Sequence, residues 1–191
     1  MNRRARRIFA VAGAVALLII GCATVAPEHA GYVEDAQRFA DGAREHFGGH
    51  RVRVFVSEDL PAGVGATHSA GTIVIRPSLF ANPHVRALLA HEIAHATLSH
   101  SGGVRDQAES RSRELDANAR AVEILVRVDG LAERDAATKV GAMIAAISQT
   151  QKGAARPLPI GHLHPCDELR DLERRYPGDW ARGLRCVEAA R

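Results

Sequence analysis

The chain has 191 residues, with 25 Lys and Arg against 22 Asp and Glu, so its formal net charge is +3 at pH 7. Four arginines lie within the first seven residues, and the chain from residue 22 onward carries 21 basic and 22 acidic residues, which argues against a nucleic-acid-binding surface. The 170 residues from Cys22 onward are enough for one domain, and an aromatic content of 4% requires a core built mostly from Ala, Val, Leu and Ile.

The N-terminus has the pattern of a bacterial lipoprotein signal. A cluster of arginines precedes an uninterrupted apolar run at 8–20, which is shorter than the ~20 residues that a membrane-spanning helix needs. The run leads into "IIGC", which resembles a lipobox, so we predict a signal peptide at 1–21 and lipidation at Cys22. The alternative is an uncleaved membrane anchor with an incidental cysteine. The signal predicts a lipid-anchored protein, palmitate included, in the bacterial envelope, facing the periplasm at the outer membrane.

The first part of the chain after the signal is predicted to hold a tether, a helix and two strands. Residues 22–32 are interpreted as a tether, and the apolar spacing in 33–47 is typical of a helix. The alternating valines of 51–57 predict a strand. Residues 58–71 are rich in Gly, Pro and Ala and are expected to form a loop, and 72–77 should form a second strand that Pro77 ends.

The rest of the chain is predicted to be mainly helical. One helix should begin at Pro83, with Asn82 as its N-cap, and end near "SHSGG". Two longer helices are expected at 106–128 and 132–150, followed by an irregular segment and a short amphipathic helix at 166–177. The order of helix, two strands and then helices predicts one small α+β domain over 33–191.

Two cysteines remain after the lipidation candidate. Cys166 and Cys186 belong to an exported chain, and in an oxidising compartment a disulfide is the default expectation. Closing this loop would stabilise the fold by roughly 3 kcal/mol in the chain-entropy model. Metal-binding thiols are the alternative, although the sequence has no CxxC spacing.

Residues 91–95 read "HEIAH" and could form half of a zinc site. Positions i and i+4 share one face of a helix, so His91 and His95 could both bind one zinc ion. Glu92 would lie beside the metal, where a general base is needed to take a proton from activated water. The alternative is a polar stripe that faces solvent. The apolar neighbours favour the metal, since burying Glu92 without a partner would be costly.

A third metal ligand must come from another segment. His100 lies nearby, but the spacing that follows "HEIAH" is not that of metzincins. We predict Glu114 as the third ligand, because it lies on one face of the next helix, and Asn118, one turn later, as a residue that hydrogen-bonds a ligand. The alternative is that Glu114 is solvated. Asp116 and Glu123 are rival carboxylates, but they point to other faces of that helix.

"HEIAH" followed by "RELDANARA" resembles the HtpX and CAAX-prenyl-protease type of zinc metallopeptidase, whose minimal soluble forms are called minigluzincins. The family pattern is HExxH and then Glu-x-x-Ala-Asp on the next helix. Glu114 and Ala117 match this pattern, and Asn118 stands where the family usually has Asp. "HLHPCDEL" adds a similarity by which His164 would approach the site and stabilise the oxyanion. A surface histidine beside a helix start is the alternative for His164.

The resemblance covers roughly 72–170. It implies a zincin-like fold, mainly helical, with a short β-hairpin or sheet before the HExxH helix, and one Zn²⁺ per chain. It also implies an endopeptidase that hydrolyses exported or envelope proteins, with Glu92 as general base and the peptide extended beside an edge strand, for which 72–77 is the candidate. A loop with His68 or His162 could cover the metal. The alternative function is a catalytically silent, metal-binding lipoprotein that acts as a binding or chaperone-like module.

Overall fold

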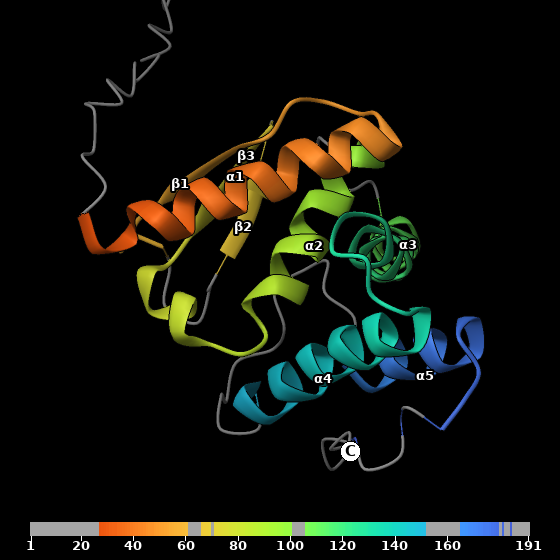
Figure 1. Ribbon diagram of the computed structural model, residues 1–191. Helices are drawn as coiled ribbons and strands as arrows, with labels where there is room; N and C mark the ends of the chain where they lie inside the picture. Colours follow the sequence, from red (N-terminus) through yellow and green to blue (C-terminus); the bar gives the residue numbers. More distant parts are fainter. Residues whose placement is uncertain are drawn as a thin grey trace, which may run out of the picture.

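The computed structural model describes residues 27–60, 66–69, 71–100, 106–151, 165–179, 181 and 184. Five α-helices and one three-stranded sheet make up the described part of the chain (Figure 1). The α+β class and the mainly helical content predicted from the sequence are therefore confirmed. The predicted signal peptide and the lipidation site Cys22 lie outside the described residues.

The sheet consists of β1 (Arg53–Val56), β2 (Ala66–Ser69) and β3 (Thr72–Ile75) in the order β1-β3-β2. β1 runs parallel to β3, and β2 pairs with β3 in antiparallel register. The expectation that 72–77 forms an edge strand is wrong, because β3 is the central strand and β2 is an edge. The prediction of a loop throughout 58–71 is also wrong, because β2 lies within this range. Its sequence "ATHS" has no apolar alternation, and its strand character comes from pairing with β3.

Helix α1 (Pro27–Phe47) begins six residues earlier than the apolar pattern indicates, within the segment that we expected to be a tether. Ala36, Phe39, Ala40 and Ala43 are buried, which confirms the predicted apolar stripe. Apolar periodicity does not predict the first turns of α1, because they lie outside this buried stripe. Tyr32, in these turns, is 53% exposed.

The same helix closes the edge of the sheet at β1. The side-chain amide of Gln37 donates to the Val52 carbonyl at 2.9 Å and accepts from the Val54 N–H at 3.0 Å. This pair of hydrogen bonds satisfies backbone groups that an edge strand would otherwise leave unpaired. Strand addition at β1 is therefore hindered, whereas the edge of β2 lies toward helix α2 (Val85–Thr97), with which β2 is in contact.

The segment between the sheet and α2 contains an unpredicted 3₁₀-helix, η1 (Pro77–Ala81). Helix α2 begins two residues after the predicted start, because the side chain of Asn82 accepts a hydrogen bond from the His84 N–H at 2.8 Å and closes a turn ahead of the helix. The α2 helix is apolar on most sides, with Ala90, Ile93 and Ala94 almost fully buried.

Helix α3 (Gln107–Val128) packs closely against α2. It begins as predicted, with the Asp106 side chain accepting from the Glu109 N–H at 2.8 Å as an N-cap. Ala117 and Ala121 are fully buried, and small side chains at these positions allow the two helix backbones to approach. The residues of α2 and α3 that the sequence singles out for a metal therefore lie on helices in direct contact.

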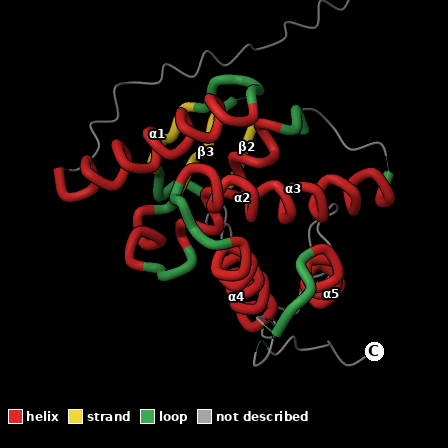
Figure 2. The backbone as a smooth tube through the Cα atoms, turned by 45° about the vertical axis from the view of Figure 1, so that its right-hand side comes forward, coloured by secondary structure: helices red, strands yellow, loops and turns green. Residues whose placement is uncertain are grey.

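Helices α4 (Glu133–Gln151) and α5 (Pro165–Arg175) pack against each other and against α3. In both views the sheet and α1 lie on one side of α3 and the pair α4–α5 lies on the other (Figures 1 and 2). Within the described part of the chain, no helix has the length and apolar character that a membrane span requires.

Candidate metal centre

Three predicted ligands meet where α2 packs on α3. One helical turn separates His91 from His95, so both imidazoles project from the same face of α2, and their Nε2 atoms lie 3.1 Å apart. Glu114 reaches them from α3, with 3.4 Å from its Oε2 to Nε2 of His91 and 3.7 Å from its Oε1 to Nε2 of His95. One ligand atom from each residue lies within 4.8 Å of the others.

These three side chains fit a zinc ion by their chemistry. Two imidazoles and one carboxylate are a donor set of catalytic zinc sites, in which a fourth position is left for water or substrate. Only 8% of His91 is exposed, and the side chains of His95 and Glu114 are each 13% exposed. A buried carboxylate beside two imidazole nitrogens requires a positive charge among them.

The pKa values of the two histidines show where that charge lies when only protons are available. Burial lowers the pKa of His91, but its hydrogen bond to Glu114 and the charges of Glu114, Glu92 and Glu168 outweigh burial and raise the pKa to about 9. Burial and the positive charge of His91 lower the pKa of His95 to about 3. One proton thus serves three converging ligand atoms, an arrangement in which a divalent cation can replace it.

The rival carboxylates on α3 have other partners. Asp116 accepts from the Ser112 hydroxyl at 3.3 Å and pairs with Arg175 at 3.2 Å. Glu123 is exposed and pairs with Arg120 one turn away. Neither belongs to the group of ligand atoms that converges with His91, so the choice of Glu114 agrees with the geometry.

Asn118 forms the hydrogen bond that the sequence predicts for it. Its Oδ1 lies 2.9 Å from Nδ1 of His91, and only 2% of the residue is exposed. A carbonyl oxygen only accepts, so Nδ1 of His91 must carry a hydrogen, and Nε2 is the nitrogen whose lone pair becomes available when a metal replaces its proton.

His95 is held by a different neighbour, His100, and the two Nδ1 atoms lie 3.1 Å apart. The C-terminus of α2 explains the contact. Ser99 has a left-handed φ of 56°, its N–H bonds the Ala96 carbonyl at 3.1 Å, and the His100 N–H bonds the His95 carbonyl at 2.8 Å. This is a Schellman motif, which turns the chain back over the last helical turn. In the sequence His100 is a candidate metal ligand only, and its contact with His95 arises from the turn at the end of α2.

Glu92 is half-buried beside the ligand group. Its carboxylate accepts a hydrogen bond from the backbone N–H of His68 in β2. Burial raises the pKa of Glu92, and the negative charge of Glu114 adds to this shift, whereas the charge of His91 and the His68 hydrogen bond oppose it. The predicted base therefore lies on the helix of the two candidate histidine ligands and is hydrogen-bonded to the edge strand β2.

A pocket of about 430 Å³ adjoins the candidate ligand His95. It lies between the chain ahead of β1, the β2–β3 turn and the end of α2, and its lining includes His50, Arg51, His68 and Ser99. Gly49 is needed beside it, because its φ of 92° is left-handed and a Cβ would lie 2.8 Å from Cα of Thr97. The pocket offers space for a ligand next to the candidate centre.

One residue close to the candidate ligands, Glu168, is not indicated by any pattern in the sequence. Glu168, in the first turn of α5, accepts a hydrogen bond from Nδ2 of Asn118 at 3.0 Å. Burial raises the pKa of Glu168 to about 7, against the opposing effects of the Asn118 hydrogen bond and the His91 charge. In the sequence this residue has the ordinary position of an acid at a helix N-terminus, which hid its contact with a helix 50 residues away.

Three predictions about the site and its surroundings concern residues that the structure does not describe. His164 and His162 lie outside the described residues, so their roles stay predictions. Cys166 is buried at the start of α5, with 3% exposed, and its predicted disulfide partner Cys186 also lies outside the described residues. The disulfide therefore stays a prediction as well. His68, considered as a cover for the metal, lies in β2.

Comparison of the chain with protein-family models, with curated proteins and with solved structures finds no match in any of the three.

Proposed function

We propose that this protein is a zinc-dependent endopeptidase with a zincin-like fold, in which His91, His95 and Glu114 hold the metal. The observation that carries the proposal is the convergence of these three ligands with Glu92 beside them. A site that only stores or senses a metal needs no carboxylate at this position. The combination of three ligands and one adjacent base is what hydrolysis requires.

When bound, zinc supplies Lewis-acid activation of a water molecule and of the peptide carbonyl. Glu92 takes the proton from the water and gives it to the leaving amine, so one carboxyl group acts first as base and then as acid. Its hydrogen bond from the His68 N–H holds the carboxylate in place beside the ligand group. Asn118 and His100 hold the rings of His91 and His95 in orientation.

The substrate is an extended peptide that lies along the edge of β2. The His68 N–H points to Glu92, hence away from β3, and the carbonyl of the same residue faces the same side of an antiparallel strand. Because the His68 N–H is taken by Glu92, a peptide on this edge would pair with the outward carbonyl of His68 and bring its own carbonyl near the metal ligands. The pocket beside His95 would then take a substrate side chain.

The test compares the purified protein with its Glu92→Gln variant for zinc content and for cleavage of an unfolded protein. We expect one zinc per chain in both, and activity about 100-fold or more lower in the variant, because general-base catalysis contributes at least this factor. The matched control Glu123→Gln changes an exposed glutamate of α3 and should retain full activity.

Each other outcome has a definite meaning. Stoichiometric zinc with equal and negligible cleavage by both proteins would reject the enzyme and favour a metal-binding module of the envelope. Absence of zinc from the wild-type protein after purification without chelators would reject the metal centre itself.

A further inference from the structure

A chain of hydrogen bonds leads from the metal ligand His91 through the core to α5. The imidazole Nδ1 of His91 donates to Oδ1 of Asn118, and Nδ2 of Asn118 donates to Oε2 of Glu168. The two distances are 2.9 and 3.0 Å. Three helices, α2, α3 and α5, each contribute one member of this chain.

Asn118 is the ambiguous member, because a carboxamide has a donor at one end and an acceptor at the other. If its amide turned over, Nδ2 would face His91, and Nδ1 of the ring would have to accept. The single hydrogen of the neutral ring would then be on Nε2, the atom that lies 3.4 Å from Oε2 of Glu114. A protonated Nε2 offers no lone pair to a metal. The orientation of the Asn118 amide therefore decides whether His91 is a ligand.

Glu168 removes this ambiguity. In its ionised form Glu168 only accepts hydrogen bonds, so the Asn118 end that faces this carboxylate must be the NH₂ group. We propose that Glu168 is a positioning residue of the metal centre, which acts through Asn118 to hold His91 in the tautomer whose Nε2 binds the metal. The inference rests on the proposed zinc site. It adds a residue from α5 that touches neither the metal nor the ligands.

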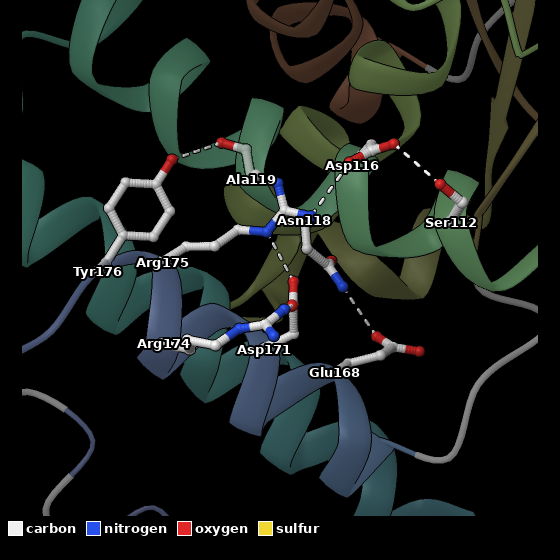
Figure 3. Close-up of polar contacts among 9 residues, drawn as sticks. All are labelled: Ser112, Asp116, Asn118, Ala119, Glu168, Asp171, Arg174, Arg175 and Tyr176. Atoms are coloured by element: carbon white, nitrogen blue, oxygen red, sulfur yellow. Dashed lines mark hydrogen bonds and ion pairs between the residues drawn. The ribbon is translucent and has the colours of Figure 1, made fainter.

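The packing of α5 supports this role, because a positioning residue must itself be held. Figure 3 shows the polar contacts that fix α5 against α3. The buried carboxylate of Asp171 accepts from Nε of Arg175 at 2.7 Å, and Arg175 also reaches Asp116 at 3.2 Å. The Tyr176 hydroxyl donates to the Ala119 carbonyl at 3.1 Å. These contacts hold both sides of the Asn118–Glu168 hydrogen bond.

The apolar side of α5 adds to this support. Leu169 and Leu172, one and four residues after Glu168 in sequence, are buried in the core. The backbone that carries Glu168 therefore has little freedom to move away from Asn118. Rigid support is what allows a residue outside the ligand set to control a ligand's orientation.

The first measurement is zinc affinity, determined by competition with a chromogenic chelator. Glu168→Ala should weaken zinc binding by about 10- to 100-fold, the usual effect of removing a partner behind a metal ligand. Glu168→Gln retains an acceptor and should lose less. The control is Asp167→Ala, which removes an acid from the same turn of α5, where Asp167 contacts Arg170 on the surface. It should leave the affinity within about 3-fold of wild type, because Asp167 has no bond to Asn118.

A second variant separates positioning from mere support of the fold. A carboxylate at 118 has no donor end, so Asn118→Asp combined with Glu168→Ala should restore zinc affinity to within about 3-fold of wild type. Loss of packing around α5 would not be restored by this change. Urea unfolding of the metal-free variants then shows whether each one is folded.

The outcomes separate this inference from the proposed function. If the wild-type protein binds no zinc, both fail. If it binds zinc and Glu168→Ala binds equally well, only the role of Glu168 fails. The role also fails if Asp167→Ala weakens binding as much as Glu168→Ala does, or if Asn118→Asp does not restore the affinity of the Glu168→Ala variant.

Discussion

The two histidines of α2 owe their orientation to neighbours of different origin. His91 is held through Asn118 by side chains from two other helices, whereas His95 is held by His100, which follows it by five residues. The second contact is local and depends on the left-handed backbone of Ser99. For a residue other than glycine, this conformation costs about 1 kcal/mol.

The left-handed conformation of Ser99 predicts that a change from serine to glycine has opposite effects on the free energy of unfolding at position 99 and inside a helix. Ser99→Gly should raise the free energy of unfolding by about 0.5–1 kcal/mol, because glycine adopts the left-handed region without the Cβ penalty. The matched change Ser112→Gly, within α3, should lower it by a similar amount, because glycine is unfavourable inside a helix. Urea unfolding of the two variants measures both effects, and changes of the same sign would contradict the interpretation of the α2 terminus.

The packing of helices depends on one cation that joins three of them. The guanidinium of Arg86, near the start of α2, makes two bonds to Asp129 at the end of α3, at 2.9 and 2.6 Å. It also bonds Asp35 of α1 at 2.8 Å and lies 3.8 Å from the centre of the Phe39 ring. Planar bidentate pairing and stacking together are specific to arginine.

Arg86 should therefore contribute more to stability than other ion-paired arginines of the protein. We expect Arg86→Ala to lower the free energy of unfolding by about 2–3 kcal/mol and Arg86→Lys to recover less than half of the loss. The control Arg38→Ala affects an arginine of α1 with a 69% exposed side chain and two exposed partners, and should cost at most about 0.5 kcal/mol. Chemical denaturation compares the three variants, and equal losses for Arg86→Ala and Arg38→Ala would refute this assignment.

A metal at the candidate centre would couple the two halves of the domain. Its ligands come from α2, which contacts the sheet, and from α3, which contacts α4 and α5. A ligand that binds only the folded state stabilises it by RT ln(1 + [L]/Kd), or about 2.7 kcal/mol at 100 times Kd. The folded state of the whole domain, not only the site, should therefore respond to zinc.

Removal of the metal should be visible in thermal unfolding. At a free zinc concentration 100 times Kd, we expect the midpoint to lie about 5–10 °C higher than with a chelator, and Glu114→Gln to abolish most of this difference. Glu123→Gln, on an exposed position of the same helix, should retain it. A zinc-dependent increase of the same size in the Glu114→Gln variant would rule out Glu114 as a ligand.

The amino-acid sequence by itself determined the features that depend on spacing along one helix. The four-residue separation of His91 and His95, the apolar stripe of α1 and the start of α3 at Asp106 are local, so their patterns could be interpreted without a fold. The sequence also predicts the roles of Glu114 and Asn118, because they lie on one face of a helix whose alanines favour close packing against α2.

Only the tertiary structure decided the features that depend on contacts between distant segments. Strand β2 is polar and exists through its pairing with β3, so the edge beside Glu92 had no pattern of its own. Glu168 is 50 residues from Asn118 in sequence. An acidic residue in the first turn of a helix is commonly exposed to solvent, so its position alone does not indicate a buried contact. The physical reason is the same in both cases: backbone pairing and a buried hydrogen bond depend on which segments meet, and local sequence does not encode that.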